Sequence, residues 1–180
     1  MLLSFNNSTG GKITVEVIKE INKYKETNKP LCIFVTFEGD DVLNKEPACT
    51  AFVLNEKIVL CKDTSALDAV LQDDIEKIVF SSKEIFSYAD KQGYEIKNLS
   101  FDISLAGYLL NPNASSYDLE KLCAQYEISV PETDEEHKDY AVLGAMPKLC
   151  AVLKEKIEEA SQSSLLYDIE IPLARVLARM

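Results

Sequence analysis

The amino-acid sequence predicts a single α/β domain built on a sheet of about five strands. Three strand-like runs follow one another, and strands then alternate with helices, which is the order typical of an α/β sheet. The 180 residues, 47% of them hydrophobic, are enough to bury one sizeable core. Within residues 98–112 the apolar period changes from that of a strand to that of a helix, so the two elements follow each other directly.

The N-terminal part predicts a helix followed by a buried strand. Residues 1–5 can add a short strand at the sheet edge. A helical apolar stripe, with Thr14 as the expected cap, ends near Pro30. Its members are Val17, Ile18, Ile21 and Tyr24. Residues 31–37 form a continuous β-rich run, which is typical of a central strand buried on both faces.

The middle of the chain predicts a hairpin and then alternating elements. The expected order is strands 48–54 and 57–61 turning at Asn55-Glu56, a helix capped by Thr64 or Ser65, a strand over 77–80, and a helix over 83–91. A short strand over 98–101 then meets a helix that ends at Asn111-Pro112. Asp102, at this junction, is expected to cap the helix with its side-chain oxygen.

Helices are expected over most of the remaining chain. Ser115 with Asp118, and Thr133 with Glu136, resemble capping boxes that begin two of them. The second is a long helical stretch, in which Gly144 and Pro147 predict a kink or break. After a linker over 161–164, residues 165–180 predict a last amphipathic helix.

Composition excludes several classes of protein. The net charge of −11 is the wrong sign for a domain that grips nucleic acid by itself, because clustered cations supply most of that affinity. No run approaches the roughly 18 apolar residues of a membrane span. The five scattered cysteines suit reduced thiols, no metal-ligand spacing is visible, and His137 reads as a solvated side chain. We expect a cytoplasmic monomer without membrane, cofactor or metal.

The string NLSFDISLAGYLLNP at 98–112 resembles a segment of the 3′ to 5′ exonuclease domain of bacterial family A DNA polymerases, the DNA polymerase I family. There, a Phe-Asp follows the second nuclease motif and a YLLNP-like helix comes next. A weaker resemblance extends from Leu31 to the end of the chain, where 165–180 is similar to the segment that leads into the polymerase domain. The resemblance implies a ribonuclease H-like fold with a mixed sheet.

Such a nuclease uses about four carboxylates to hold two divalent cations roughly 4 Å apart. The family's first motif, Phe-Asp-Thr-Glu-Thr, aligns with residues 34–38, which places Val35 and Phe37 at the two acidic positions. A shift of one residue would instead place Thr36 and Glu38 there. In either register the resemblance implies that at least one acid of the pair is missing.

The second and third motifs also lack an acidic residue that the family's pattern has. Counted back from Phe101-Asp102, the acidic position of the second motif is occupied by Ile85. In the third motif, Tyr-x-x-x-Asp, the tyrosine is retained as Tyr140 and Gly144 stands in place of the aspartate. We therefore expect Val35, Phe37 and Ile85 to pack together and close the former cleft, beside the helix at Tyr140.

The resulting hypothesis is a nuclease-inactive structural domain over 1–163, followed at 164–180 by a helix leading toward an absent polymerase domain. The resemblance implies a parent chain that copies DNA in replication and repair. Its polymerase domain would be the partner, with DNA bound weakly or not at all by this domain alone. The alternative is a divergent metal-dependent exonuclease with displaced carboxylates such as Glu38 and Asp139. An unrelated interaction domain would be favoured only by a different sheet order.

Overall fold

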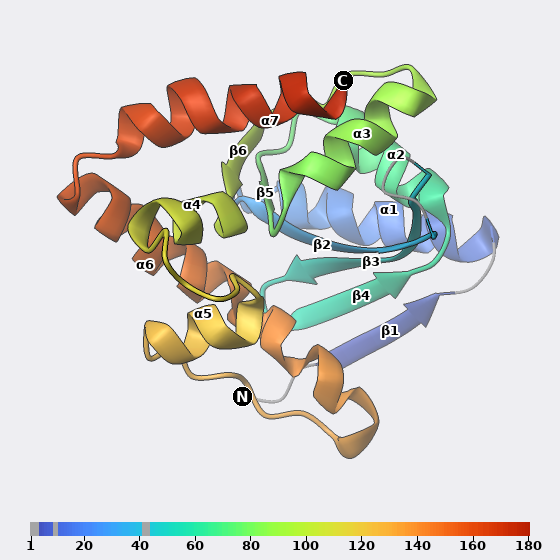
Figure 1. Cartoon of the computed structure of the whole chain (residues 1–180). Coiled ribbons are helices and arrows are strands. Elements are labelled where there is room, and N and C mark those ends of the chain that lie inside the picture. Colours follow the sequence, from blue (N-terminus) through green and yellow to red (C-terminus); the bar gives the residue numbers. More distant parts are fainter. Residues whose placement is uncertain (1–3, 9–10, 41–43) are drawn as a thin grey trace.

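The computed structural model describes residues 4–8, 11–40 and 44–180 and shows helices on both faces of a mixed sheet (Figure 1). The sheet has six strands in the order β1-β4-β3-β2-β5-β6. Their bounds are β1 Ser4–Ser8, β2 Leu31–Glu38, β3 Glu46–Leu54, β4 Lys57–Cys61, β5 Lys77–Val79 and β6 Leu99–Asp102. The strand beyond the expected five is β1, which pairs parallel with β4 at the sheet edge. Residues 1–3 of its predicted span lie outside the described residues.

The pairing of the strands follows from their connections. β2, β3 and β4 are antiparallel neighbours, whereas β5 lies parallel to β2 and β6 parallel to β5. The predicted hairpin turn is confirmed, because Leu54 pairs with Lys57 across Asn55-Glu56. Asn55 has a φ of 57°, a left-handed conformation that asparagine adopts more readily than most residues.

The helices begin close to where the sequence predicts them. Their bounds are α1 Gly11–Lys25, α2 Thr64–Gln72, α3 Ser82–Gln92, α4 Ile103–Leu110, α5 Leu119–Gln125, the 3₁₀-helix η1 Glu135–Ala145, α6 Met146–Glu159, the π-helical η2 Leu165–Glu170 and α7 Ile171–Ala178. The expected caps of four of them are wrong. Thr14 lies inside α1, which begins at Gly11. In the other three, Asp63, Asp118 and Asp134 instead accept a hydrogen bond from a backbone N–H of the first turn, since a carboxylate is as good a cap as a hydroxyl.

The long helical stretch breaks where Gly144 and Pro147 predict. The 3₁₀-helix η1 ends at Ala145, and the α-helical α6 begins at Met146 with Pro147 in its first turn. Proline is tolerated there, because the first backbone N–H groups of a helix have no partner within the helix.

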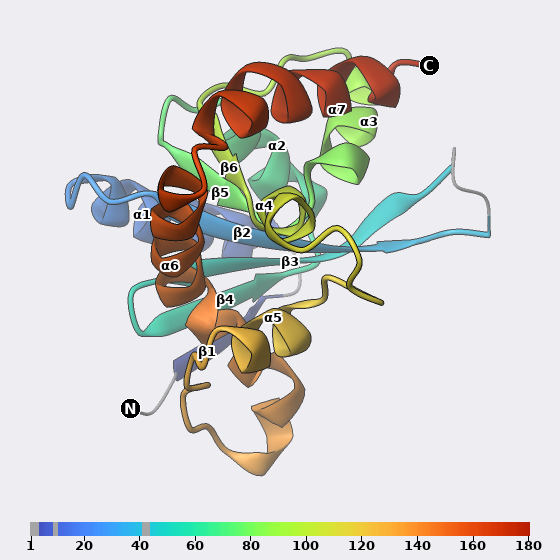
Figure 2. The same cartoon turned by 60° about the vertical axis from the view of Figure 1, so that its left-hand side comes forward.

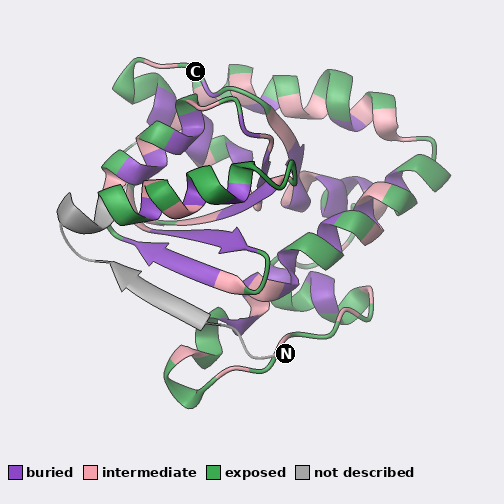
Figure 3. Cartoon of the chain, turned by 180° about the vertical axis from the view of Figure 1, so that it is seen from behind, coloured by how far each residue is buried: buried purple, intermediate pink, exposed green. Residues whose placement is uncertain are grey.

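The sheet divides the hydrophobic core into two clusters (Figure 3). Helices α1, α2 and α3 cover one face, and α4, α5 and α6 cover the other (Figure 2). β2 contributes Leu31 and Ile33 to the first cluster and Cys32 to the second. Side chains of a strand alternate between faces, so this arrangement confirms β2 as a central strand buried on both sides.

Asp102 connects two helices from a buried position at the end of β6. Its side chain is 1% exposed, and its Oδ1 accepts hydrogen bonds from the Leu105 backbone N–H and the Ser104 hydroxyl, each at 2.9 Å. Its Oδ2 accepts from the backbone N–H of Ser82, the first residue of α3, at 2.7 Å. The predicted cap of α4 is confirmed, and the same carboxylate also caps α3. Burial raises the pKa of Asp102, and these hydrogen bonds oppose the rise.

We expect Asp102→Ala to lower the free energy of unfolding by about 3 kcal/mol, because it leaves the buried backbone N–H of Ser82 and the partly buried N–H of Leu105 without an acceptor. The matched control is Asp118→Ala, which removes an exposed cap from α5 and should cost about 1 kcal/mol. Urea denaturation of both variants at neutral pH measures the difference. Equal losses would show that the second helix gains nothing from Asp102.

Lys77 is a fully buried lysine at the start of β5. Its Nζ donates to three backbone carbonyl oxygens, those of Asp73 at 2.5 Å, Ile75 at 2.9 Å and Lys97 at 2.6 Å. An ammonium has three donors, so all of them are satisfied. Burial lowers the pKa of Lys77 to about 8. The side chain thereby ties the loop before β5 to the loop before β6.

Candidate functional site

Residues from the first two predicted motifs line one cleft. Val35 and Phe37 extend from β2, and Ile85 lies in the first turn of α3. The cleft has a volume of about 380 Å³. Its other lining residues are Phe34, Thr36, Lys45, Phe80, Ser81 and Glu84.

The local structure explains why these positions meet. Val35 and Phe37 are two residues apart on a strand and pack against the same hydrophobic cluster, to which Ile85 belongs. β2 and β5 are parallel, so their carboxyl ends lie at the same edge of the sheet. α3 begins directly after β5, and its first residue, Ser82, is held by Asp102.

The walls of the cleft are mainly apolar. Five lining side chains carry no polar atom: Phe34, Val35, Phe37, Phe80 and Ile85. The rings of Phe34 and Phe80 lie 5.5 Å apart between centroids. The charged lining residues are Lys45 and Glu84, and the Glu84 carboxylate accepts a hydrogen bond from the Ser81 hydroxyl at 3.0 Å. Hard divalent cations require several oxygen ligands, of which these walls offer few.

The expectation that the apolar side chains close the cleft is wrong. Ile85 is 2% exposed, but Val35 and Phe37 are only half-buried and the cleft remains open beside them. The pairing of the sheet gives the reason. β5 pairs with β2 only over Leu31–Ile33, so the later part of β2 extends beyond β5 with β3 as its paired neighbour.

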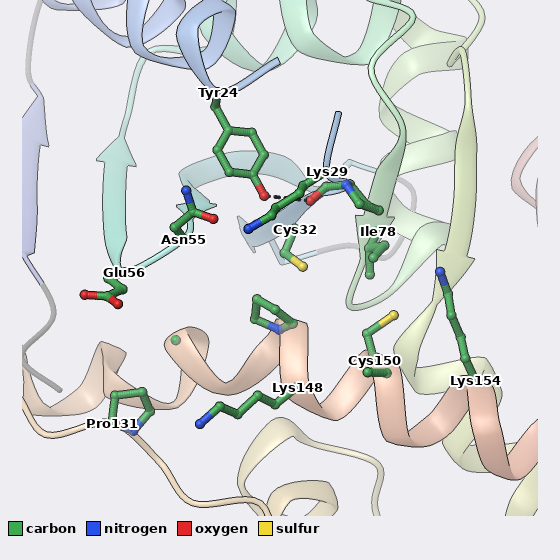
Figure 4. A pocket seen from close by; sticks show the side chains of 14 residues that line it. Tyr24, Lys29, Cys32, Asn55, Glu56, Ile78, Pro131, Lys148, Cys150 and Lys154 are labelled. Atoms are coloured by element: carbon green, nitrogen blue, oxygen red, sulfur yellow. Dashed lines mark hydrogen bonds between the residues drawn. The ribbon is translucent and has the colours of Figure 1, made fainter. Parts of the chain in front are cut away.

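The third motif lies elsewhere, so the expectation that the helix at Tyr140 completes this pocket is also wrong. Tyr140 is 38% exposed on η1, which contacts β3 and β4. Gly144 lines a second cavity, together with Tyr24 of α1 and Cys32 near the start of β2 (Figure 4). The structure therefore separates Tyr140 and Gly144 from Val35, Phe37 and Ile85.

The remaining acidic candidates are exposed. Glu38 lies at the end of β2 opposite Glu46 of β3, and Asp139 lies on η1. Thr36, the other residue of the shifted register, donates a hydrogen bond from its hydroxyl to the Cys49 carbonyl at 3.2 Å. Over residues 4–8, 11–40 and 44–180, no group of three or more His, Cys, Asp or Glu side chains is placed to hold a metal ion.

Sequence reasoning missed the second cavity. It has a volume of about 470 Å³, and Lys29, Lys148 and Lys154 are among its lining residues. These lysines come from segments far apart in the chain, so no local pattern could indicate the cavity.

In the part of the chain that the structure describes, no helix is long and apolar enough to cross a membrane.

Comparisons with known proteins relate most of the chain to one protein family. Residues 42–140 match the family described as the DNA polymerase I, ribonuclease H-like domain. DNA polymerase I of Bacillus subtilis strain 168 is 27% identical over 172 residues, covering 82% of this chain and 19% of that protein. DNA polymerase I of Streptococcus pneumoniae serotype 4 is 30% identical over 133 residues, covering 63% of this chain and 15% of that protein. The chain thus spans less than a fifth of the length of these relatives.

Solved structures share the architecture. The POL domain of Pol1 from M. smegmatis, in complex with DNA primer-template and dNTP, has a TM-score of 0.73 at 18% identity, covering 97% of this chain and 31% of that one. Escherichia coli RNase D, an exoribonuclease involved in structured RNA processing, has a TM-score of 0.73 at 13% identity, covering 98% and 51%. These likenesses, with the family match, show a ribonuclease H-like exonuclease fold, as the sequence resemblance implies.

Proposed function

Because the chain belongs to the family of DNA polymerase I ribonuclease H-like domains, we propose that it is a structural module of a DNA polymerase chain whose nuclease chemistry has been lost. The observation that carries the proposal is the lining of the cleft. Val35, Phe37 and Ile85 stand together where the resemblance places three of the four carboxylates. Apolar side chains cannot ligate a divalent cation. Without bound cations, the site has no means to activate a water molecule or to stabilise the leaving oxygen.

The C-terminal helix supports a scaffolding role. α7 packs on α3, with the Arg175 guanidinium 5.2 Å from the centre of the Phe86 ring and Arg179 Nε 3.2 Å from Asp90 Oδ1. The C-terminal segment carries large apolar side chains that are 44% to 90% exposed. They recur at helical spacing and comprise Ile169 of η2, Leu173, Val176 and Leu177 of α7, and Met180, which follows that helix. An exposed apolar stripe of this kind is typical of a contact surface.

In this proposal the stripe contacts the polymerase domain of the same parent chain, a cytoplasmic enzyme that carries out template-directed synthesis in DNA replication and repair. The module itself is a monomer that needs no cofactor or metal. Its net charge of −11 repels the negatively charged DNA backbone, so we expect the isolated module to bind DNA weakly or not at all. Contact with DNA would then come through the parent protein.

The proposal predicts no metal-dependent nuclease activity. Single-stranded DNA labelled at its 5′ end, incubated in excess of protein with Mg²⁺ or Mn²⁺, should keep its full length, because the cleft presents apolar side chains in place of metal ligands. An active 3′ to 5′ exonuclease assayed in parallel serves as the positive control. Shortening that requires metal and disappears in Glu38→Gln or Asp139→Asn would instead support the divergent exonuclease with displaced carboxylates.

A further inference from the structure

The cavity that Gly144 lines combines an apolar floor with a cationic rim. Its residues come mainly from the end of α1 and the chain after it, β2, the β3–β4 turn, β5, the end of η1 and α6. At about 470 Å³ its volume falls within the range of small-molecule sites. It lies near the start of β2, whereas the cleft at Val35 and Phe37 lies near the end of that strand. The two sites are therefore distinct.

The charges around this cavity oppose the charge of the chain. Three lysines and one glutamate are among its lining residues: Lys29, Lys148, Lys154 and Glu56. Lys29 and Lys148 have no carboxylate within 4.0 Å among the residues that the structure describes. The ammonium of Lys154 lies 5.4 Å from the centre of the Phe101 ring. Local positive charge in a chain of net charge −11 favours an anion at this place.

The arrangement of the side chains separates charge from apolar surface (Figure 4). In that view Lys29 and Lys148 extend toward the side where Asn55 and Glu56 lie, Lys154 stands at the opposite end, and Cys32, Ile78 and Cys150 lie between them. Cys32 and Cys150 are each 2% exposed. Burial raises the pKa of the Cys150 thiol to about 11, and that of Cys32 is raised too, so the floor is uncharged at neutral pH.

From this geometry we propose that the cavity binds a small organic anion, a phosphate monoester or a carboxylate, with its charged group at the rim that Lys29 and Lys148 line and its apolar body on the floor of Cys32, Ile78 and Cys150. Lysine ammonium groups bind phosphate and carboxylate as point charges. The apolar floor gives a reason for an organic body, since inorganic phosphate alone would leave it uncovered. The proposal is independent of the function of the cleft.

The test is a titration of the full chain with naphthyl phosphate and with naphthoate, followed by NMR chemical shifts of the backbone amides. We expect saturable shifts at Cys32, Ile78, Gly144 and Cys150 with at least one of the two probes, and the stronger of them identifies the preferred anionic group. Inorganic phosphate, which lacks the apolar body, should bind at least about tenfold more weakly.

Single-charge variants on the rim give the decisive comparison. Lys148→Gln should weaken binding of the better probe about fivefold, and Glu56→Gln should strengthen it by a similar factor, as expected for unit charges a few ångströms from the ligand in a wet site. Lys121→Gln, an equal change of net charge on α5, is the matched control and should leave affinity unchanged. Absence of saturable binding by both probes, equal affinity for inorganic phosphate, or equal affinity in all three variants would overturn the proposal.

Discussion

Replacing Ile85 by aspartate, the acid that the resemblance places there, is expected to lower the free energy of unfolding by about 3–5 kcal/mol at neutral pH. Ile85 is 2% exposed within the hydrophobic cluster beneath α3, so the variant buries a carboxylate that has neither metal nor partner. Such a group takes up a proton with a raised pKa. Its folded form then binds a proton that the unfolded chain releases, and the deficit should shrink as the pH falls toward 4, the ordinary pKa of aspartate.

Val35→Asp is the matched control for this measurement. Val35 is half-buried beside an open cleft, where water can solvate the new carboxylate, so its cost should stay near 1 kcal/mol. Urea denaturation of both variants at two pH values checks the prediction. Equal costs at the two positions would mean that the two sites are solvated alike, contrary to the structure. Neither variant alone is expected to restore nuclease activity.

Lys77→Met should lower the free energy of unfolding by about 2–4 kcal/mol at pH 7, because three carbonyl oxygens, that of Ile75 buried and the other two partly buried, lose their common donor. The control is Lys97→Met, which removes an exposed ammonium 3.9 Å from Asp74 and should change stability by less than about 1 kcal/mol. Chemical denaturation of the two variants beside the unmodified chain provides the comparison. A small loss at Lys77 would show that its carbonyl partners are solvated without it.

The pH dependence of this difference follows from the lowered pKa of Lys77. Between about pH 8 and the ordinary pKa of 10.5, the folded chain has released this proton and the unfolded chain still holds it. Stability from Lys77 therefore rises with pH across that window, by up to about 3 kcal/mol relative to Lys77→Met. Tyrosine and cysteine titrations are common to both proteins and cancel in the difference. A difference that falls or stays level from pH 8 to pH 10 would contradict a lowered pKa.

Local patterns predicted most of the fold. The strand of 31–37, the hairpin at Asn55-Glu56 and the break between Gly144 and Pro147 each depend on neighbouring residues, and the structure places them as expected. Caps were less predictable, because a hydroxyl and an adjacent carboxylate compete for the same backbone N–H. Asp63 and Asp134 therefore cap helices that Thr64 or Ser65 and Thr133 were expected to begin.

The site was predictable only in part, because some of its residues are brought together or separated by contacts between segments far apart in the sequence. Val35 and Phe37 share a face of one strand, and the register of parallel β2 and β5 brings Ile85 to them. The position of Tyr140 depends instead on how η1 packs against β3 and β4, which no periodicity reveals. Lys77 was equally hidden. A lysine in a strand is normally exposed, and its three carbonyl partners lie in turns whose geometry only the fold defines.

The shared cap at Asp102 has a consequence for local opening of the native state. The first turns of α3 and α4 both depend on one buried carboxylate, since Ser82 and Leu105 donate to its two oxygens. Either turn can fray alone only by breaking its own bond to a carboxylate that the other turn still holds in place. Once that side chain leaves its site, both helix starts lose their acceptor together. We therefore expect an opening that displaces Asp102 to expose the wall of the cleft at Ile85 and the start of α4 together.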